Sequence, residues 1–394
     1  MIALKVGTAV AKPGTLQFGS WPAWEYPTGG RESLPVIVAR GRRDGPCVWL
    51  TAGIHGDEQA GPAVLYHLMS PELAASMRGT VVAVPALSPS ALRCLRYQPD
   101  HLTENPNRLW PEHRPGKRDP EGGPPSSTEK VYGRLFDRIA KSADYLIDYH
   151  NAWPRSLSFA FRDRIFYRGQ DPDAGAQLQR AQELANVQDE MLRAYGHTVV
   201  GEFPAERCME EGLQRSLSAA AMIVAGVPAV TVELGTGDRP DPAIVSAAVA
   251  GTRNVLRSVG VLDGAPEPIT GIKKVEPETP VRRTRALRVD RACVLLHLVE
   301  AGDRVEAGEP VAEVRDAWGR PLGDGLLRSR HDGFVIGLPR GIYFFPGAPA
   351  AYLAIPDNAP RVVPYPPEPQ RDPPSSHPGP SAPSGNQDGL AMPE

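Results

Sequence analysis

The chain has 394 residues, which is enough for one large domain and a smaller one, each with its own core. Its formal net charge of −3 is close to neutral, so bulk electrostatics indicates neither a nucleic-acid partner nor an anionic membrane. The four scattered cysteines, and the lack of a signal peptide or of 18 continuous apolar residues, predict a cytoplasmic protein without disulfides, a thiolate metal site or a membrane span.

Short apolar runs alternate with helical segments along the first 260 residues. We expect strands where apolar runs are bracketed by glycine or proline, and helices where apolar residues recur every three or four positions. This alternation predicts an α/β fold, with a mixed, largely parallel sheet sandwiched by helices. The expected strands are 34–38, 47–52, 80–85, 144–149 and 227–234, and the expected helices are 60–68, 131–142, 177–195, 217–225 and 242–259.

The pattern changes after residue 270, where short β-rich runs alternate with glycine and proline turns. The turn signature in residues 300–311 and the run 333–337 resemble a biotinyl/lipoyl-type β-barrel. No lysine follows Lys274, so a covalently modified carrier is not expected. We therefore predict a small all-β domain over residues 271–356, with strands at 284–289, 294–297, 311–314, 333–338 and 351–355.

The end of the chain is rich in proline. Residues 356–394 contain 12 prolines, mixed with Ser, Gly, Asp and Asn. Such a segment buries too little apolar surface to offset the entropy lost on ordering. We therefore predict a disordered tail over residues 357–394, with a proline-rich docking peptide as the functional alternative.

Two histidines and a glutamate have the composition of a catalytic metal site. His55 and Glu58 lie in the segment Gly-Ile-His-Gly-Asp-Glu, and His150 follows 95 residues after His55. Two imidazoles and one carboxylate are the ligands of a catalytic zinc that keeps its fourth position for water. His-x-x-Glu alone is a weak motif, and an ordinary surface pair is its simpler explanation.

Two further carboxylates accompany this set. Glu233 interrupts an apolar run, and an ionised carboxylate is costly to bury without a partner. General-base work beside a metal-bound water explains its presence. Asp148 lies two residues before His150 on one strand, so both side chains share a face, and the carboxylate can orient the imidazole.

The candidate site residues on three different segments each come at or just after the end of a predicted strand. In open α/β sheets, ligands bind beyond the carboxyl ends of the strands. His55, His150 and Glu233 each occupy such a position. We therefore expect one site that contains all three residues. Three residues in equivalent positions are much harder to explain by chance than any one of the motifs alone.

Four ordered motifs resemble the succinylglutamate desuccinylase/aspartoacylase family, a branch of the zinc carboxypeptidase-like fold. They are Gly-Ile-His-Gly-Asp-Glu with His55, Asn-Arg-Leu-Trp-Pro from Asn107, Ile-Asp-Tyr-His-Asn with His150, and Val-Pro-Ala-Val-Thr-Val-Glu-Leu-Gly with Glu233. The resemblance covers roughly residues 1–356. It implies that residues 1–270 are a zinc-hydrolase catalytic domain, including an N-terminal β extension.

The resemblance also implies a role for each matching residue. His55, Glu58 and His150 would hold one zinc ion per chain, and Glu233 would be the general base. Asn107 and Arg108 would bind a substrate carboxylate, for which the planar guanidinium is suited. Arg96 would stabilise the oxyanion, with an ordinary surface arginine in a basic stretch as the alternative.

These parts predict a zinc-dependent amidohydrolase that acts on carbon–nitrogen bonds other than peptide bonds. Its substrate would be an N-acylated amino acid or a related small acid, of acetyl or succinyl type. A metallocarboxypeptidase and a non-catalytic zinc-binding scaffold are the alternatives. The chain is compatible with a homo-oligomer. A proline- and glycine-rich insertion over residues 112–128 is expected to be a lid or a disordered segment near the site.

Overall fold

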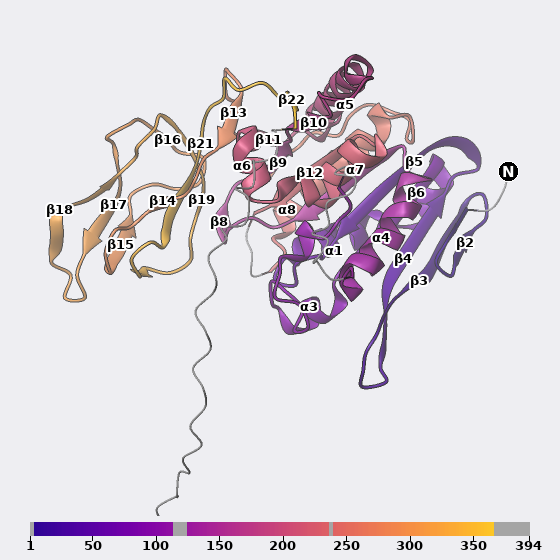
Figure 1. The fold of residues 1–394 in the computed structure, drawn as a ribbon, viewed down its shortest axis with the longest axis horizontal. Helices are drawn as coiled ribbons and strands as arrows, with labels where there is room; N and C mark the ends of the chain where they lie inside the picture. The colour runs from indigo at the N-terminus through magenta and orange to yellow at the C-terminus, as the bar shows by residue number, and fades with distance from the viewer. Residues whose placement is uncertain (1–3, 113–123, 236–238, 366–394) are drawn as a thin grey trace, which may run out of the picture.

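A long mixed sheet runs through the molecule (Figure 1). The computed structural model describes residues 4–112, 124–235 and 239–365. The central pairs β6–β5, β5–β7 and β7–β12 are parallel, and so is β9–β11, whereas β3–β4, β4–β6 and β12–β9 are antiparallel. In spatial order the body strands are β3 (Thr15–Glu25), β4 (Arg31–Arg40), β6 (Arg78–Val84), β5 (Arg43–Ala52), β7 (Tyr145–His150), β12 (Ala229–Leu234), β9 (Ser158–Arg162) and β11 (Thr198–Gly201).

Helices cover both faces of this sheet because its strands alternate between two apolar cores. Val48 and Leu50 of β5 pack into the core that contains α1, α2 and α8, whereas Trp49 packs into the core that contains α4 and α7. This confirms the predicted α/β sandwich. The main helices are α1 (Ala60–Leu68), α2 (Pro71–Ser76), α4 (Ser127–Ala140), α5 (Ala174–Tyr195), α7 (Leu217–Ala225) and α8 (Pro242–Ser258); the short ones are α3 (Pro89–Cys94), α6 (Ala205–Glu210), η1 (Pro106–Arg108) and η2 (Leu213–Arg215).

Local capping explains where several helices begin. Ser126 accepts a hydrogen bond from the backbone N–H of Glu129, and the Glu129 side chain accepts one from the Ser126 N–H. This capping box starts α4 four residues before the predicted position. Asp241 caps α8 in a similar way, and Pro242 occupies its first turn.

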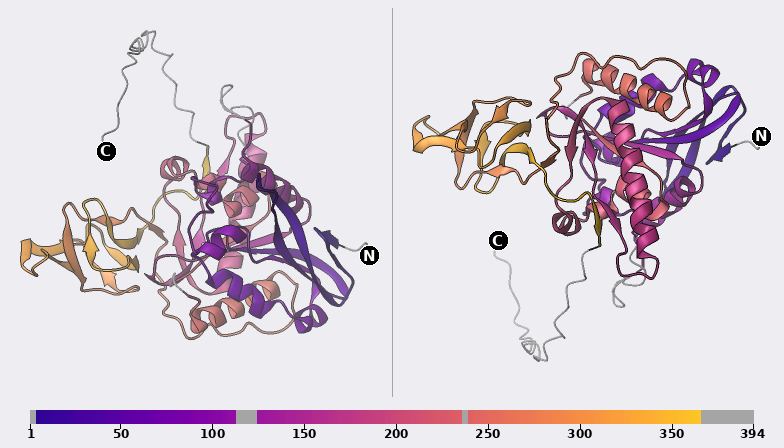
Figure 2. Two further views of the ribbon diagram at one scale, coloured as in Figure 1. Left: turned by 90° about the horizontal axis from the view of Figure 1, so that it is seen from below. Right: turned by 90° about the horizontal axis from the view of Figure 1, so that it is seen from above.

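The β-rich end of the chain is built on the edge of the same sheet (Figure 2). Strand β13 (Val281–Arg283) pairs with β11 and with β21 (Pro349–Pro356), which continues to β19 (Gly333–Leu338) and β16 (Arg304–Val305). Strands β8 (Arg155–Ser156) and β14 (Leu287–Arg288) join β19 and β21. A separate sheet has the order β18 (Pro321–Arg328), β17 (Pro310–Arg315), β15 (Cys293–His297) and β20 (Tyr343–Phe344).

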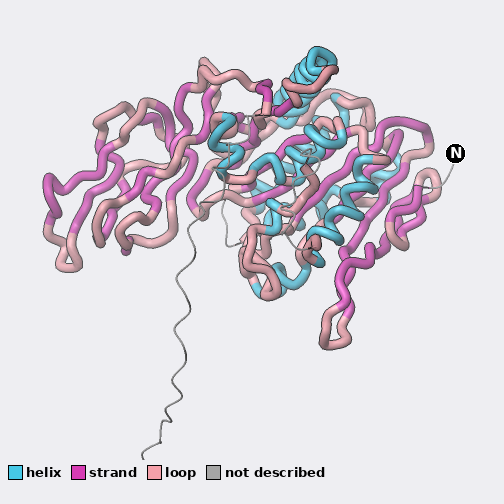
Figure 3. Tube along the Cα trace, viewed as in Figure 1, coloured by secondary structure: helices cyan, strands magenta, loops and turns pink. Residues whose placement is uncertain are grey.

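Figure 3 shows the observed strands in magenta. Several of them had no counterpart among the predicted elements. Strand β9 is aromatic-rich but only five residues long. Strand β3 contains both glycine and proline, and these two residue types weaken a strand signal. The small N-terminal hairpin of β1 (Leu4–Val6) and β2 (Ala9–Ala11) lies in the expected N-terminal β extension, for which no individual strands were predicted.

The predicted start of the tail at residue 357 is wrong for residues 357–365. Strand β22 (Val362–Pro364) pairs in parallel with β10 (Ile165–Tyr167), and Val363 is buried against Phe166 and its neighbours. Arg164, itself buried, binds the carboxylate of Asp357 at 2.6 Å. Composition alone missed this segment because a few specific contacts, not bulk apolarity, attach it. Residues 366–394, and most of the predicted insertion (113–123), lie outside the described residues.

A bilayer-spanning helix is absent from the described ranges, whose longest helix, α5, carries polar side chains along its whole length.

Candidate active site

The carboxyl ends of three parallel strands bring the sequence-predicted residues together. In the register of β7 and β12, His150 lies opposite Glu233, and Asp148 lies opposite Thr231. Strand β5 is parallel to β7 on the other side, and it ends three residues before His55. The site therefore lies where parallel sheets commonly bind ligands.

Two glycines allow the chain to leave β5 in the required direction. Gly53 has a φ of +67°, which is unfavourable for other residues. A Cβ on Gly56 would lie 2.1 Å from the backbone of Ala91, and the Gly56 N–H donates to the Arg96 carbonyl at 2.9 Å. This tight turn places His55 and Glu58 over the end of the sheet.

His55, Glu58 and His150 form a compact buried group. Their candidate ligand atoms all lie within 4.8 Å of one another. The Nδ1 atoms of His55 and His150 face the two oxygens of Glu58, at 2.7 and 2.8 Å. Burial alone would raise the pKa of Glu58, but the two imidazoles outweigh burial and lower it to about 2. The carboxylate is therefore ionised at neutral pH, as a metal ligand must be.

The opposite nitrogen of each imidazole has an oxygen acceptor. His150 Nε2 lies 2.9 Å from Asp148 Oδ2, and the other Asp148 oxygen accepts a hydrogen bond from Thr51. His55 Nε2 lies 2.9 Å from Asn105 Oδ1. These contacts favour protonation at Nε2, which leaves the Nδ1 lone pairs for a metal ion. The orienting role predicted for Asp148 agrees with this geometry, whereas Asn105 was not foreseen.

Glu233 lies beside this group without a hydrogen bond on one oxygen. Its Oε2 is buried and has no partner among the described residues. Burial is the main reason that the pKa of Glu233 is raised to about 8, with the nearby Glu58 charge adding to the effect. The neighbouring His150 opposes this rise. A carboxyl group with such a pKa exchanges protons near neutral pH.

These side chains share a cavity of about 800 Å³. Its walls combine aromatic rings, carboxylates and arginines, as expected for a site that binds a small polar molecule. Besides the residues above, its lining includes Asp57, Tyr97, Asn107, Arg108, Trp153, Phe159, Phe161, Asp163, Glu202, Leu213, Arg283 and Arg340.

Of the three remaining predicted residues, Asn107 and Arg108 lie at the cavity and Arg96 does not. Asn107 and Arg108 both line the cavity, and the Asn107 amide lies 3.2 Å from His150 Nε2. Arg96 is exposed and is not among the lining residues, so the structure does not bring it to the other site residues. The adjacent Tyr97 does line the cavity, and it stacks on His55 with ring centroids 3.9 Å apart.

Sequence reasoning missed the contributions from the β-rich end of the chain. Arg283 of β13 and Arg340, which follows β19, both line the cavity. Trp153 lines it too, and its ring stacks on Tyr352 of β21 at 3.6 Å. No local motif marks these positions, because only the pairing of β13 with β11 and of β19 with β8 brings them to the site.

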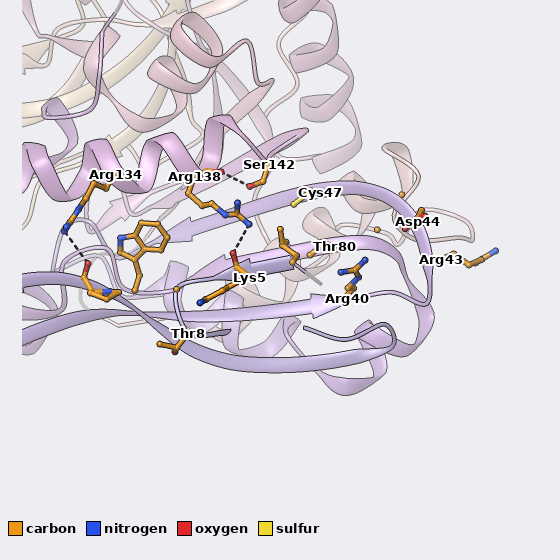
Figure 4. A pocket seen from close by; sticks show the side chains of 16 residues that line it. Lys5, Thr8, Arg40, Arg43, Asp44, Cys47, Thr80, Arg134, Arg138 and Ser142 are labelled. Atoms are coloured by element: carbon orange, nitrogen blue, oxygen red, sulfur yellow. Dashed lines mark hydrogen bonds between the residues drawn. The ribbon is translucent and has the colours of Figure 1, made fainter. Parts of the chain in front are cut away.

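A second cavity, of about 960 Å³, lies near the other end of β5 (Figure 4). Arg138 of α4 donates to the Lys5 carbonyl at 2.7 Å, and Arg134 donates to the Ala23 carbonyl at 3.2 Å. These bonds join α4 to the N-terminal strands. Its described lining residues include one carboxylate, Asp44, and no histidine, so this cavity lacks the composition of a metal site.

Comparison with known proteins agrees with the family resemblance of the motifs. The model of the succinylglutamate desuccinylase/aspartoacylase catalytic domain matches residues 44–259. An N-alpha-acetyl-L-2,4-diaminobutyric acid deacetylase of Halomonas elongata is 26% identical over 315 residues, which cover 78% of this chain and 81% of the relative.

Two solved structures share the fold. A succinylglutamate desuccinylase/aspartoacylase of Rhodobacter sphaeroides is 20% identical with a TM-score of 0.67, and the match covers 87% of this chain and 96% of the other. The product-bound ectoine utilization protein EutE of Ruegeria pomeroyi is 20% identical with a TM-score of 0.66, covering 86% and 94%. The family model extends over more than half of the sequence and includes the histidine–glutamate–histidine group. The chain therefore belongs to the succinylglutamate desuccinylase/aspartoacylase family.

Proposed function

We propose that this protein is a zinc-dependent hydrolase that removes the acyl group from an N-acylated amino acid or a related small acid. The observation that carries this proposal is the buried group of His55, Glu58 and His150, with Glu233 beside it in one cavity. A family of deacylases and a relative named as a deacetylase support the reaction class.

The residues fit a catalytic zinc ion better than a structural one. His55, Glu58 and His150 offer three ligands, whereas a structural zinc site is normally closed by four. When bound, zinc lowers the pKa of a coordinated water to about 7 and polarises the substrate carbonyl. Asp148 and Asn105 hold the two imidazoles in the tautomer that such binding requires.

Glu233 would move the proton in both halves of the reaction. As the water attacks the amide carbonyl, the carboxylate accepts the proton of the water, and it then delivers this proton to the leaving amine. Burial, which raises the pKa of Glu233, favours the protonated form needed for the second half. The products are a carboxylate and a free amino compound.

The cavity favours a substrate that carries a carboxylate. Three arginines, Arg108, Arg283 and Arg340, line it together with Asn107. Guanidinium groups bind carboxylates through paired charge-assisted hydrogen bonds. Because the relative from Halomonas is named for an N-acetylated diamino acid, Nα-acetyl-L-2,4-diaminobutyric acid is the first substrate to test.

Hydrolysis assays with and without metal test the proposal. We expect the zinc-loaded protein to deacylate this compound, an N-succinyl amino acid, or both, and a chelator to abolish the activity. His55→Ala and His150→Ala should lose both zinc and activity, whereas His67→Ala, on the exposed side of α1, should keep both. Hydrolysis confined to dipeptides would identify a carboxypeptidase instead. Full zinc occupancy in both site variants would refute the ligand assignment.

A further inference from the structure

We propose that Arg283, from the β-rich end of the chain, binds the carboxylate of the substrate. This inference rests on the proposed function and extends it, because it names the residue that selects an acid over a neutral amide. It also differs from the expectation that Arg108 is the principal anchor. The argument depends on how each guanidinium is held and on which of its edges remains free.

Arg283 is held by two aromatic rings and by a contact along one edge. Its guanidinium carbon lies 4.8 Å from the ring centroid of Phe161 and 4.3 Å from that of Phe203. Its Nε atom donates to Glu202 Oε2 at 2.8 Å, and the Glu202 carboxylate is itself buried. Aromatic stacking and the Glu202 contact therefore hold the guanidinium in one plane before a substrate arrives.

The opposite edge of Arg283 remains available. Its two terminal nitrogens have no hydrogen-bond partner among the described residues, and Arg283 lines the cavity. A planar guanidinium presents two parallel N–H groups that match the two oxygens of a carboxylate. A preorganised arginine with this edge free in a cavity is suited to bidentate carboxylate binding.

Two nitrogen atoms of Arg108 already donate hydrogen bonds to backbone carbonyls. Its Nε atom donates to the Glu211 carbonyl at 2.8 Å, and one terminal nitrogen donates to the Asn107 carbonyl at 2.7 Å. The Asn107 amide is also engaged, since its oxygen accepts from the Leu217 N–H at 3.0 Å and its nitrogen faces His150. Arg108 and Asn107 thus support the cavity wall beside His150.

The sheet register places the ring on which Arg283 stacks close to the reacting groups. Phe161, on which Arg283 stacks, lies opposite Thr231, two residues along β12 from Glu233. Two residues of a strand span about 7 Å. This separation is comparable to the length of the amino-acid half of a small N-acyl substrate. A scissile amide near Glu233 would therefore leave its carboxylate within reach of Arg283.

The test compares an acid with its neutral analogue. We would measure kcat/KM for Nα-acetyl-L-2,4-diaminobutyric acid and for the same compound with a carboxamide, using zinc-loaded protein. Arg283→Gln should lower the preference for the acid by roughly ten- to a hundredfold, because a charge-assisted bond is lost only with the acid. Arg283→Lys should retain part of the preference for the acid, since lysine keeps the charge but not the planar pair of donors.

Three variants make the result specific. Arg282→Gln is the matched control, because Arg282 precedes Arg283 on β13, points to the other face and contacts Asp357. The preference of Arg282→Gln for the acid over the carboxamide should equal that of the wild type. Arg283→Gln combined with Glu202→Gln avoids leaving the buried Glu202 carboxylate without its counter-ion and should show the same loss as Arg283→Gln alone. Arg108→Gln should reduce activity on the acid and on the carboxamide alike.

Calorimetry separates this inference from the proposed function. Binding of both compounds to zinc-loaded Glu233→Gln protein, with and without Arg283→Gln, needs no turnover. A preference for the acid that disappears with Arg283→Gln supports the inference, even if the wild type hydrolyses neither compound and the proposed function fails. A preference that survives in Arg283→Gln, or that is lost only in Arg108→Gln, overturns it.

Discussion

Two glutamates that line one cavity, Glu58 and Glu233, differ in ionisation because their neighbours differ. Glu58 has an imidazole against each oxygen, which lowers its pKa to about 2 in spite of burial. Glu233 has a buried oxygen without a partner, and burial raises its pKa to about 8. A pair of carboxylates with such different pKa values can divide the work between metal binding and proton transfer.

This division predicts the effect of removing the proton acceptor. Glu233→Gln preserves the shape of the side chain but cannot accept a proton. We expect zinc content to stay near one ion per chain while kcat falls by about 10²–10⁴-fold. Glu183→Gln, on the exposed side of α5, is the control and should leave kcat unchanged. A loss below about tenfold would make Glu233 a structural residue.

Outside the active site, His197 predicts a loss of stability in mild acid. It is buried, it bonds to Ser158 at 2.9 Å, and burial lowers its pKa to about 4. In the unfolded chain the His197 imidazole has its ordinary pKa of about 6.5, so between pH 6.5 and 4 it binds a proton in the unfolded state but not in the folded state. Its stabilising contribution is therefore complete above pH 6.5 and is lost as the pH falls towards 4, by up to about 3 kcal/mol.

Urea unfolding at several pH values measures this effect. His197→Gln keeps a polar group near Ser158 but removes the titrating imidazole, so its unfolding free energy should fall less steeply between pH 6.5 and 4. The exposed His67→Gln should keep the wild-type slope. Equal slopes in all three proteins would mean that His197 does not contribute to the acid sensitivity.

At the scale of whole elements, the site depends on how closely α1 approaches the sheet. Gly61 lies in the first turn of α1, three residues after Glu58, and it faces Tyr149 and Ala52. A Cβ at Gly61 would lie 2.7 Å from the Cβ of Tyr149 and 2.9 Å from that of Ala52. The helix can therefore contact the strands only because this residue has no side chain.

Two glycine-to-alanine changes test this packing. Gly61→Ala should lower the free energy of unfolding by about 1–3 kcal/mol, the usual cost of overpacking a core, and should also weaken zinc binding because α1 follows Glu58. Gly133→Ala, at an open position in α4, should instead raise stability by about 0.5–1 kcal/mol. Denaturant titrations of both variants measure the difference. Equal effects would refute the close approach of α1.

At the scale of the whole molecule, the last described residues hold the β-rich end against the body. Arg164 is buried and donates to Asp357 and to the carbonyls of Ala359 and Pro360. Arg361 reaches Asp189 at 2.7 Å, and β22 pairs with β10. The segment thus returns from the β-rich strands to the α/β body and closes the structure.

Truncation at two positions tests the importance of this return. A chain that ends at residue 356 loses β22 and leaves the buried Arg164 without its carboxylate, which should cost about 3–5 kcal/mol. A chain that ends at residue 365 keeps every one of these contacts and should unfold at the wild-type denaturant concentration. If both truncations behave alike, these contacts do not stabilise the fold.

The sequence alone determined much of the body and of its chemistry. The bounds predicted for α1 and α7 agree with those observed. In α1 the helical spacing of the apolar residues reports the buried face, whereas α7 is apolar almost throughout and is buried at seven consecutive positions. His55, His150 and Glu233 were predicted to meet because each follows a strand of one parallel sheet. The short strand β9 was not predicted because five residues are too few for their alternation to be a clear signal.

Only the tertiary structure decided which arginine faces the cavity with a free edge. The family resemblance pointed to Arg96 and no local motif pointed to Arg283, yet Arg96 is exposed whereas Arg283 lines the cavity and contacts two aromatic rings. The attachment of residues 357–365 was decided in the same way. Periodicity and motifs report local structure and the burial of a face. The partner of a particular side chain, in contrast, depends on which distant strands pair, and that pairing depends on the packing of the whole chain.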